Sequence, residues 1–278
     1  MNAWYRWPAL VVLLVGVGLA GWWMTRGEDS SYERIDGEIF ATHYRITYRR
    51  GADVQAVRQA VEAELNRIDQ MASTWKADSE LMRYNRAEAP ERVALSPELS
   101  GLLKYAEQIE SQTSGSFSLR PDGSQIDLSG IAKGYAVDRV VAILERDFEI
   151  DVCLVDIGGE VKARGDGPSG NAWRVQIYLP SAAVDLEAPT VILRDNSIAT
   201  SGAYFKGDHI INPATGKAVV NELISVSVIH KSSTTADALA TALYVMGPVT
   251  GMRWAKDNAI HAIFIFKDGT RQSSVLND

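Results

Sequence analysis

Residues 233–247 read STTADALATALYVMG, and this stretch decides how the rest of the chain is arranged. Helical spacing places Leu239 and Leu243 on one side of a helix, whereas Asp237 and Thr241 lie one turn apart on the other. Alanine and apolar residues fill most remaining positions, so the stretch predicts a buried helix that packs closely against its neighbours. A Gly-Pro pair predicts its end.

The pair Asp237 and Thr241 has two interpretations. A buried carboxylate is costly unless it is paired or bound to a metal ion. A carboxylate and a hydroxyl four residues apart on a helix can reach one hard cation, which prefers oxygen ligands. Alternatively, Asp237 is exposed near the helix N-terminus, where the helix dipole favours a negative charge. Spacing alone leaves both interpretations open.

Outward from this helix, local patterns predict the other elements. Further helices are expected over 53–74, 96–115 and 130–148, and strands over 39–50, 152–165, 172–180, 189–200 and 223–230, with a late hairpin over 259–272. Helices and strands do not alternate regularly. The predicted fold class is therefore α+β, a single domain over 31–278 with mostly antiparallel sheet and packed helices. Ser96 is the expected N-cap of the second helix, and residues 27–37 are expected to be a polar linker.

The first 30 residues differ from the rest. Residues 7–25 carry no charge, and this stretch is long enough for a helix that crosses a bilayer. Tryptophans flank both of its ends. We expect segment 1–30 to be a hydrophobic membrane-anchoring helix. The alternative is a cleaved signal peptide. Either way, residues 31–278 are expected to be exported.

Composition argues against nucleic-acid binding and against an internal disulfide. The net charge of −7 and the lack of basic runs beyond the N-terminal segment argue against nucleic-acid binding. The single cysteine, Cys153, sits in an apolar run, so we expect a buried core residue and no internal disulfide.

Three polar stretches could carry chemistry. In 125–138, Lys133 and glycines stand where a helix begins, which suits a phosphate; the alternative is a plain strand-to-helix turn. The two glycines of 154–165 predict a bulge or tight contact, or backbone packed against a flat ring. Loop 197–217 contains His209, a candidate general base; the alternative, which the loop alone favours, is a surface histidine.

Taken together, six segments in order resemble the ApbE family of FAD:protein FMN transferases. They are 73–85, 127–139, 154–165, 197–205, 209–217 and 234–247. The resemblance implies an enzyme that binds FAD and Mg²⁺. It implies that a threonine hydroxyl of a target protein attacks the FMN phosphate, so that AMP leaves and FMN stays attached.

The resemblance also assigns roles to individual residues. The implied metal ligands are Gly130, Asp237 and Thr241, and His209 matches a histidine proposed to deprotonate the acceptor threonine. The implied contacts to the flavin nucleotide are Phe40, Trp75, Ser116, Phe117, Ser118, Asp127, Lys133 and Ile211.

The chain departs from the family pattern in places. Ser118 stands where aspartate is expected, and the stretch from Phe117 to Asp127 is shorter than usual. Asp156 and Glu160 stand where asparagine is common. These departures predict an intact metal and phosphate core with a rebuilt flavin or adenine rim.

The expected protein is thus a membrane-tethered FMN transferase of the bacterial inner membrane, facing the periplasm or cell exterior. Its acceptor would be a flavoprotein, such as a subunit of an electron-transfer complex. Two alternatives remain: a non-catalytic protein that binds and delivers FAD, and an FAD pyrophosphatase that uses water as acceptor. A purely structural envelope protein would not need all six segments.

Overall fold

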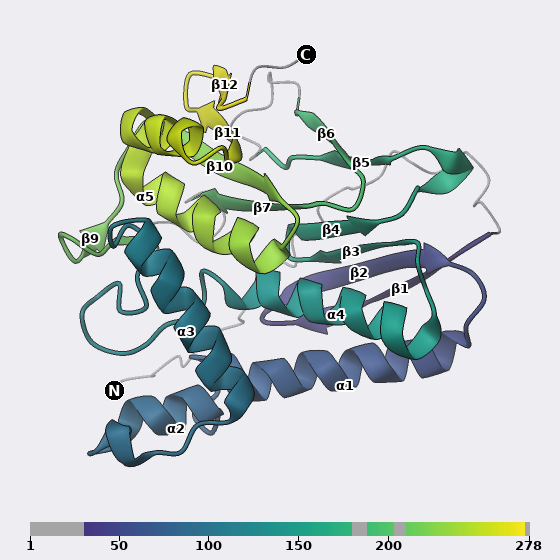
Figure 1. Cartoon of the computed structure of the whole chain (residues 1–278), viewed down its shortest axis with the longest axis horizontal. Coiled ribbons are helices and arrows are strands. Elements are labelled where there is room, and N and C mark those ends of the chain that lie inside the picture. Colours follow the sequence, from purple (N-terminus) through teal and green to yellow (C-terminus); the bar gives the residue numbers. More distant parts are fainter. Residues whose placement is uncertain (1–30, 180–187, 203–209, 276–278) are drawn as a thin grey trace, which may run out of the picture.

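The computed structural model describes residues 31–179, 188–202 and 210–275 (Figure 1). Its centre is an eight-stranded sheet in the order β1-β2-β3-β4-β7-β10-β11-β12, and every strand pairing among the described residues is antiparallel. This confirms the predicted α+β class. Segment 1–30, the predicted anchor, lies outside the described residues. Within them, no helix combines the length and apolarity needed to cross a membrane.

The elements have the following bounds. The central sheet contains β1 (Tyr32–Ile39), β2 (Thr42–Arg49), β3 (Cys153–Ile157), β4 (Glu160–Arg164), β7 (Ser197–Gly202), β10 (Leu223–His230), β11 (His261–Phe266) and β12 (Arg271–Ser273). Two small sheets pair β5 (Trp173–Gln176) with β6 (Thr190–Leu193), and β8 (Ile211–Asn212) with β9 (Lys217–Ala218). The helices are α1 (Val54–Ala72), α2 (Glu80–Arg86), α3 (Pro97–Gln112), α4 (Ala132–Phe148) and α5 (Ser233–Asp257).

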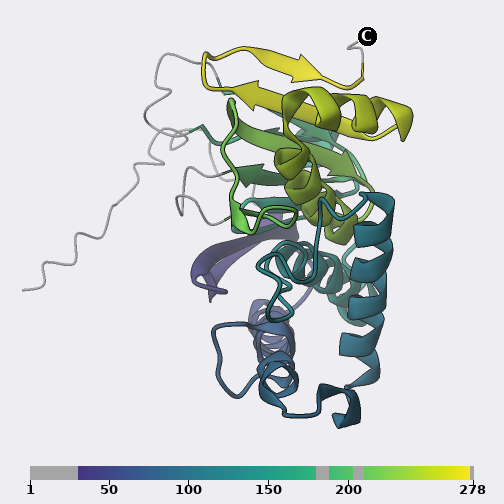
Figure 2. The ribbon, with the colours of Figure 1, turned by 90° about the vertical axis from the view of Figure 1, so that its left-hand side faces the viewer.

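The two faces of the sheet are covered differently. Helices α1, α4 and α5 pack on one face, and Figure 2 shows the helices gathered on that side. On β2 the alternate residues Tyr44, Ile46 and Tyr48 are buried in this helical core. On the opposite face, the β5–β6 hairpin covers part of the sheet, with Trp173 and Leu193 in a second apolar cluster. Cys153 is buried and unpaired, as expected.

Helices α4 and α5 approach each other closely at their N-terminal ends. A Cβ on Gly134 would lie 2.3 Å from the Ser233 carbonyl oxygen and 2.7 Å from Asp237 Cβ, so only glycine fits this position. The Gly134 N–H donates to Asp237 Oδ2 at 2.9 Å. Since the residue at the α4 N-cap, Ile131, contributes no side-chain cap, Asp237 of α5 fulfils that function.

The capping is reciprocal, because Asp138 of α4 caps α5. Its carboxylate accepts the Ser233 and Thr234 N–H groups at 3.0 and 2.9 Å, and the hydroxyls of Ser232 and Thr234 at 2.9 and 2.7 Å. Lys162 Nζ pairs with it at 2.6 Å. Burial alone would raise the pKa of Asp138, but Lys162 and the Thr234 donors outweigh burial and hold the pKa below its ordinary value. The reciprocal hydrogen bonds thus hold the two helices together at the ends that carry Lys133 and Asp237.

We expect Asp138→Asn to reduce the free energy of unfolding by about 1.5–3 kcal/mol at neutral pH, because an amide NH₂ would face these donors. The folded-state pKa is lowered from 3.8, so the stabilisation is complete above about pH 3.8 and is lost as pH falls through the lowered pKa. The difference in stability between wild type and variant should therefore shrink below that pH in denaturant titrations. A difference that stays constant down to pH 2 would contradict this role for the carboxylate.

Several local predictions are confirmed and others are wrong. Ser96 caps α3, accepting the Leu99 N–H at 3.2 Å. Residues 32–37, expected in a linker, belong to β1, because Ile35 is fully buried against the helical core. Helix α2 was not predicted, since seven residues are too few to show helical periodicity.

Two further expectations are corrected by glycine conformations. The stretch 152–165 is a hairpin and not one strand, because Gly158 and Gly159 both adopt positive φ (64° and 99°) and turn the chain. At Gly247, φ 75° and ψ 178° interrupt α5 where its end was expected, but the helix resumes and runs to Asp257.

Candidate active site

A cavity of about 750 Å³ lies where the β1–β2 turn, the β3–β4 turn and the N-terminal ends of α4 and α5 meet. All the site residues predicted from the sequence line it, apart from two discussed below. These lining residues are Phe40, Ser116, Phe117, Ser118, Asp127, Gly130, Lys133, Ile211, Asp237 and Thr241.

The β1–β2 turn sets one wall of the cavity. Phe40 and Ala41 both adopt positive φ (51° and 54°), as the two central residues of a tight hairpin turn do. A bulky side chain rarely adopts this conformation, and here it carries Phe40 to the cavity wall. Ile211 and Ile177 add apolar surface to the lining, which suits a flat aromatic ring.

Asp237 and Thr241 form an oxygen-rich corner of the cavity. Asp237 is 4% exposed, and its second carboxylate oxygen has no hydrogen-bond partner among the described residues. The Thr241 hydroxyl lies 3.0 Å from Ser201 Oγ. Gly130 is close by, since a Cβ there would lie 3.2 Å from Thr241 Oγ1.

This corner fits a hard divalent cation. Asp237 offers a free carboxylate oxygen, Thr241 a hydroxyl and Gly130 its backbone carbonyl, and magnesium prefers such oxygen ligands while keeping several waters. No cluster of three or more His, Cys, Asp or Glu suited to a metal occurs in the described part of the chain. A magnesium site there would therefore depend on one carboxylate supplemented by neutral oxygens.

Lys133 supplies the positive charge beside this corner. Its ammonium pairs with Glu160, which is 1% exposed, and Asp156 and Asp237 also lie within its electrostatic reach. Burial would lower the pKa of Lys133, but these carboxylates outweigh it and raise the pKa. Burial raises the pKa of Glu160 and of Asp237, because one ammonium only partly compensates several buried carboxylates. An additional positive charge in this corner would therefore be electrostatically favourable.

The segment before α4 is held by polar contacts to α2 and by contacts within the segment itself. Asn85 of α2 makes two hydrogen bonds with the Ile126 backbone, at 3.0 and 2.8 Å. Asp127 accepts the Ser129 N–H at 2.8 Å and lies 3.1 Å from its hydroxyl. Ser118, where aspartate was expected, accepts the Arg120 N–H at 3.1 Å and still lines the cavity.

Two predicted residues stand apart. Trp75 is 89% exposed and does not line the cavity. It lies in the turn after α1, where Ser73 Oγ accepts the N–H groups of Trp75 and Lys76 at 3.1 and 3.2 Å, and this turn does not bring the ring to the cavity. His209 lies outside the described residues.

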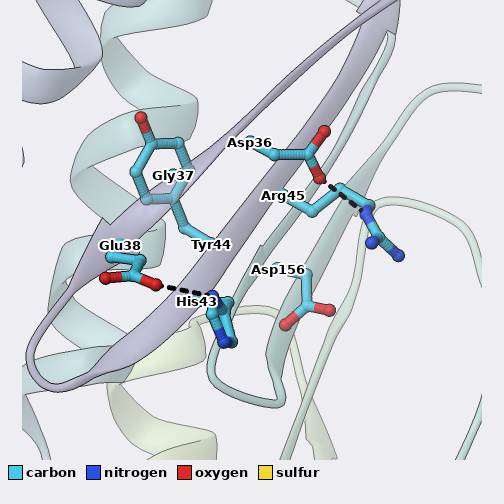
Figure 3. Close-up of a pocket in the computed structure, with 7 residues that line it drawn as sticks. All are labelled: Asp36, Gly37, Glu38, His43, Tyr44, Arg45 and Asp156. Carbon is cyan, nitrogen blue, oxygen red and sulfur yellow. Dashed lines mark hydrogen bonds and ion pairs between the residues drawn. The ribbon is translucent and has the colours of Figure 1, made fainter. Parts of the chain in front are cut away.

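A second pocket, of about 440 Å³, adjoins the cavity and shares His43 and Asp156 with it (Figure 3). It lies on β1 and β2, where Arg45 pairs with Asp36 at 2.9 Å and exposed His43 lies 3.6 Å from Glu38. Burial would raise the pKa of Asp36, but Arg34 and Arg45 outweigh it and lower the pKa. The rim of the cavity on this side is therefore charged, in contrast to the apolar wall at Ile177 and Ile211.

The arrangement of these segments matches known proteins. A model described as the ApbE family matches residues 40–120 and 118–264. The chain belongs to the ApbE family. It is 31% identical to an FAD:protein FMN transferase of Vibrio cholerae serotype O1, over 92% of this chain and 95% of that protein. It is 26% identical to one of Klebsiella pneumoniae, over 84% of each.

Solved structures of ApbE proteins share the fold. The flavin transferase ApbE from Vibrio cholerae superposes with a TM-score of 0.79 at 29% identity, covering 87% of this chain and 96% of that one. The Pseudomonas stutzeri flavinyl transferase ApbE gives 0.78 at 28% identity, covering 87% and 94%. The two stretches matched to the ApbE family meet at residues 118–120, within the 117–127 stretch that was expected to be shorter than the family pattern.

Part of the lining was not predicted from the sequence. Ser201 touches Thr241, and Gln176 at the end of β5 and Tyr178 just after it border the cavity. The SIATSG stretch, dense in small polar residues, was the available signal for Ser201. The strand itself was predicted within 172–180, but no local pattern indicated that β5 borders the cavity, because this depends on how the β5–β6 hairpin packs on the sheet.

Proposed function

We propose that this chain transfers FMN from FAD to a threonine hydroxyl of another protein in a Mg²⁺-dependent reaction. The observation that supports this most is the meeting of Asp237, Thr241, Gly130 and Lys133 in one cavity with an apolar wall. The cavity offers an oxygen-rich corner for a cation, a helix N-terminus with a lysine for phosphate, and a surface for a flat ring. Membership of the ApbE family, whose relatives are named FAD:protein FMN transferases, supports the same reaction.

The reaction balances as a phosphoryl transfer. The acceptor oxygen forms a bond to the FMN phosphorus, the anhydride bond to the AMP phosphate breaks, and AMP leaves with the bridging oxygen. The hydroxyl proton passes to a base, for which His209 is the candidate. Mg²⁺ bound by Asp237, Thr241 and Gly130 would neutralise charge on the phosphates. Lys133, at the start of α4, would orient the diphosphate.

The test uses the full chain in detergent with FAD, Mg²⁺ and an acceptor protein that carries a target threonine. We expect AMP release together with an FMN-sized mass gain on the acceptor, and loss of both when EDTA removes the metal. AMP and free FMN without acceptor would instead indicate a pyrophosphatase. FAD binding without AMP release, both with and without the acceptor, would indicate a delivery protein. The segment around Ser118 would then be the first place to examine.

We also propose that segment 1–30 tethers the enzyme to the bacterial inner membrane, with residues 31–278 outside the cytoplasm. The uncharged stretch 7–25 with its flanking tryptophans supports this. The acceptor would then be an exported flavoprotein or a subunit of an electron-transfer complex. Cell fractionation combined with the mass of the N-terminal peptide separates an uncleaved anchor from a cleaved signal peptide.

A further inference from the structure

Glu160 is a buried carboxylate in the cavity to which the family resemblance gives no role. It begins β4 directly after the Gly158–Gly159 turn, and that turn is fixed on both sides. The Gly159 N–H donates to Asp156 Oδ1 at 3.0 Å, and a Cβ on Gly158 would lie 2.7 Å from Thr42 Cγ2. The Glu160 carboxylate is therefore held rigidly opposite the start of α4.

The ammonium of Lys133 has two buried carboxylates near it, those of Glu160 and Asp237. Within the described structure its one ion pair is with Glu160, although Asp237 lies nearby, since the N–H of the neighbouring residue Gly134 donates to Asp237 Oδ2. The second oxygen of Asp237 is left without a hydrogen bond among the described residues. A buried ammonium that lost its partner would move to the nearest remaining carboxylate, because an uncompensated buried charge is strongly destabilising.

We propose that Glu160 is a positioning residue that holds Lys133 and so keeps its ammonium from pairing with Asp237. The free oxygen of Asp237 is thereby left to bind a divalent cation. This inference rests on the proposed function, since the cation is the magnesium assigned there. Residues that orient a metal ligand without touching the metal typically change metal affinity 10–100-fold when replaced, and Glu160 belongs to this class.

The test measures Mn²⁺ binding to the full chain by electron paramagnetic resonance, without FAD or acceptor. In Glu160→Gln, the neutral amide cannot hold the ammonium against Asp237, so we expect Mn²⁺ affinity to fall by about 10–100-fold. Glu160→Asp keeps the charge but withdraws the carboxylate from Lys133 by one methylene, so it should also lose affinity. Asp156→Asn is the matched control, because it removes a carboxylate from the same cavity without releasing Lys133, and its loss should be much smaller.

A double variant completes the design. Lys133→Met added to Glu160→Gln removes the competing ammonium, so Mn²⁺ affinity should recover relative to Glu160→Gln alone. Unchanged affinity in Glu160→Gln, or wild-type affinity in Glu160→Asp, would overturn the proposal. An equal loss of Mn²⁺ affinity in Asp156→Asn would also overturn it, because the loss would then follow from the change in net charge alone. If the wild type binds no Mn²⁺, this inference and the metal assignment both fall, whereas failure of FMN transfer alone leaves the binding result standing.

Discussion

Replacing Asp237 by Asn should reduce FMN transfer by at least about 10²-fold, because the amide removes the one charged ligand of the cation corner. The fold should be nearly unaffected. Asn presents a carbonyl oxygen of the same size, which can keep accepting the Gly134 N–H that Asp237 Oδ2 now accepts at 2.9 Å. The change therefore separates the two functions of this side chain, as metal ligand and as cap of α4.

The measurements are initial rates of AMP release at saturating FAD, Mn²⁺ affinity, and the free energy of unfolding without metal. Asp237→Ala is the matched comparison, because it removes the cap as well as the ligand. It should lose a further 0.5–2 kcal/mol or so of stability, the usual cost of removing a helix cap. Transfer at the wild-type rate in Asp237→Asn would rule out the metal assignment and leave Asp237 as a purely structural cap.

The parts of the fold that could be predicted from the sequence are those specified by local pattern. The apolar stripes of α1 and α3, the nearly continuous apolar run of α5 and the cap at Ser96 are local features, so a short window contains the whole signal. Strand β1 was missed because its outward residues are charged. Its role appears only when Asp36 pairs with Arg45 of the next strand and Ile35 enters the core.

The features of the site likewise fall into those that short segments of sequence predict and those that they do not. The residues that line the cavity were found because they lie in short segments that resemble the ApbE family, in order along the chain. Contacts between segments could not be found from local patterns, as with Asp138 and the α5 N-terminus, about 95 positions away, or Lys133 and Glu160. Trp75 lies in one of these segments but is exposed and outside the cavity lining, so its contact with the flavin stays a prediction.

The close approach of α4 to α5 leaves no room for a side chain at Gly134. Gly134→Ala should reduce the free energy of unfolding by about 3 kcal/mol, since its Cβ would meet the Ser233 carbonyl, a backbone atom that cannot rotate away. The matched control is Gly101→Ala in α3, where a Cβ meets nothing within 4 Å and should stabilise the helix by about 0.5–1 kcal/mol.

The same substitution links stability to function, because the two helix ends that it separates carry Lys133 and Asp237. Moving α5 away from α4 would break the hydrogen bond from Gly134 to Asp237 and pull the carboxylate from the cation corner. Gly134→Ala should therefore weaken Mn²⁺ binding even under conditions where the protein is fully folded, whereas Gly101→Ala should leave it unchanged. Equal stability of the two variants in denaturant titrations would show that the helices can separate at little cost, and the cation corner would then not depend on this crossing.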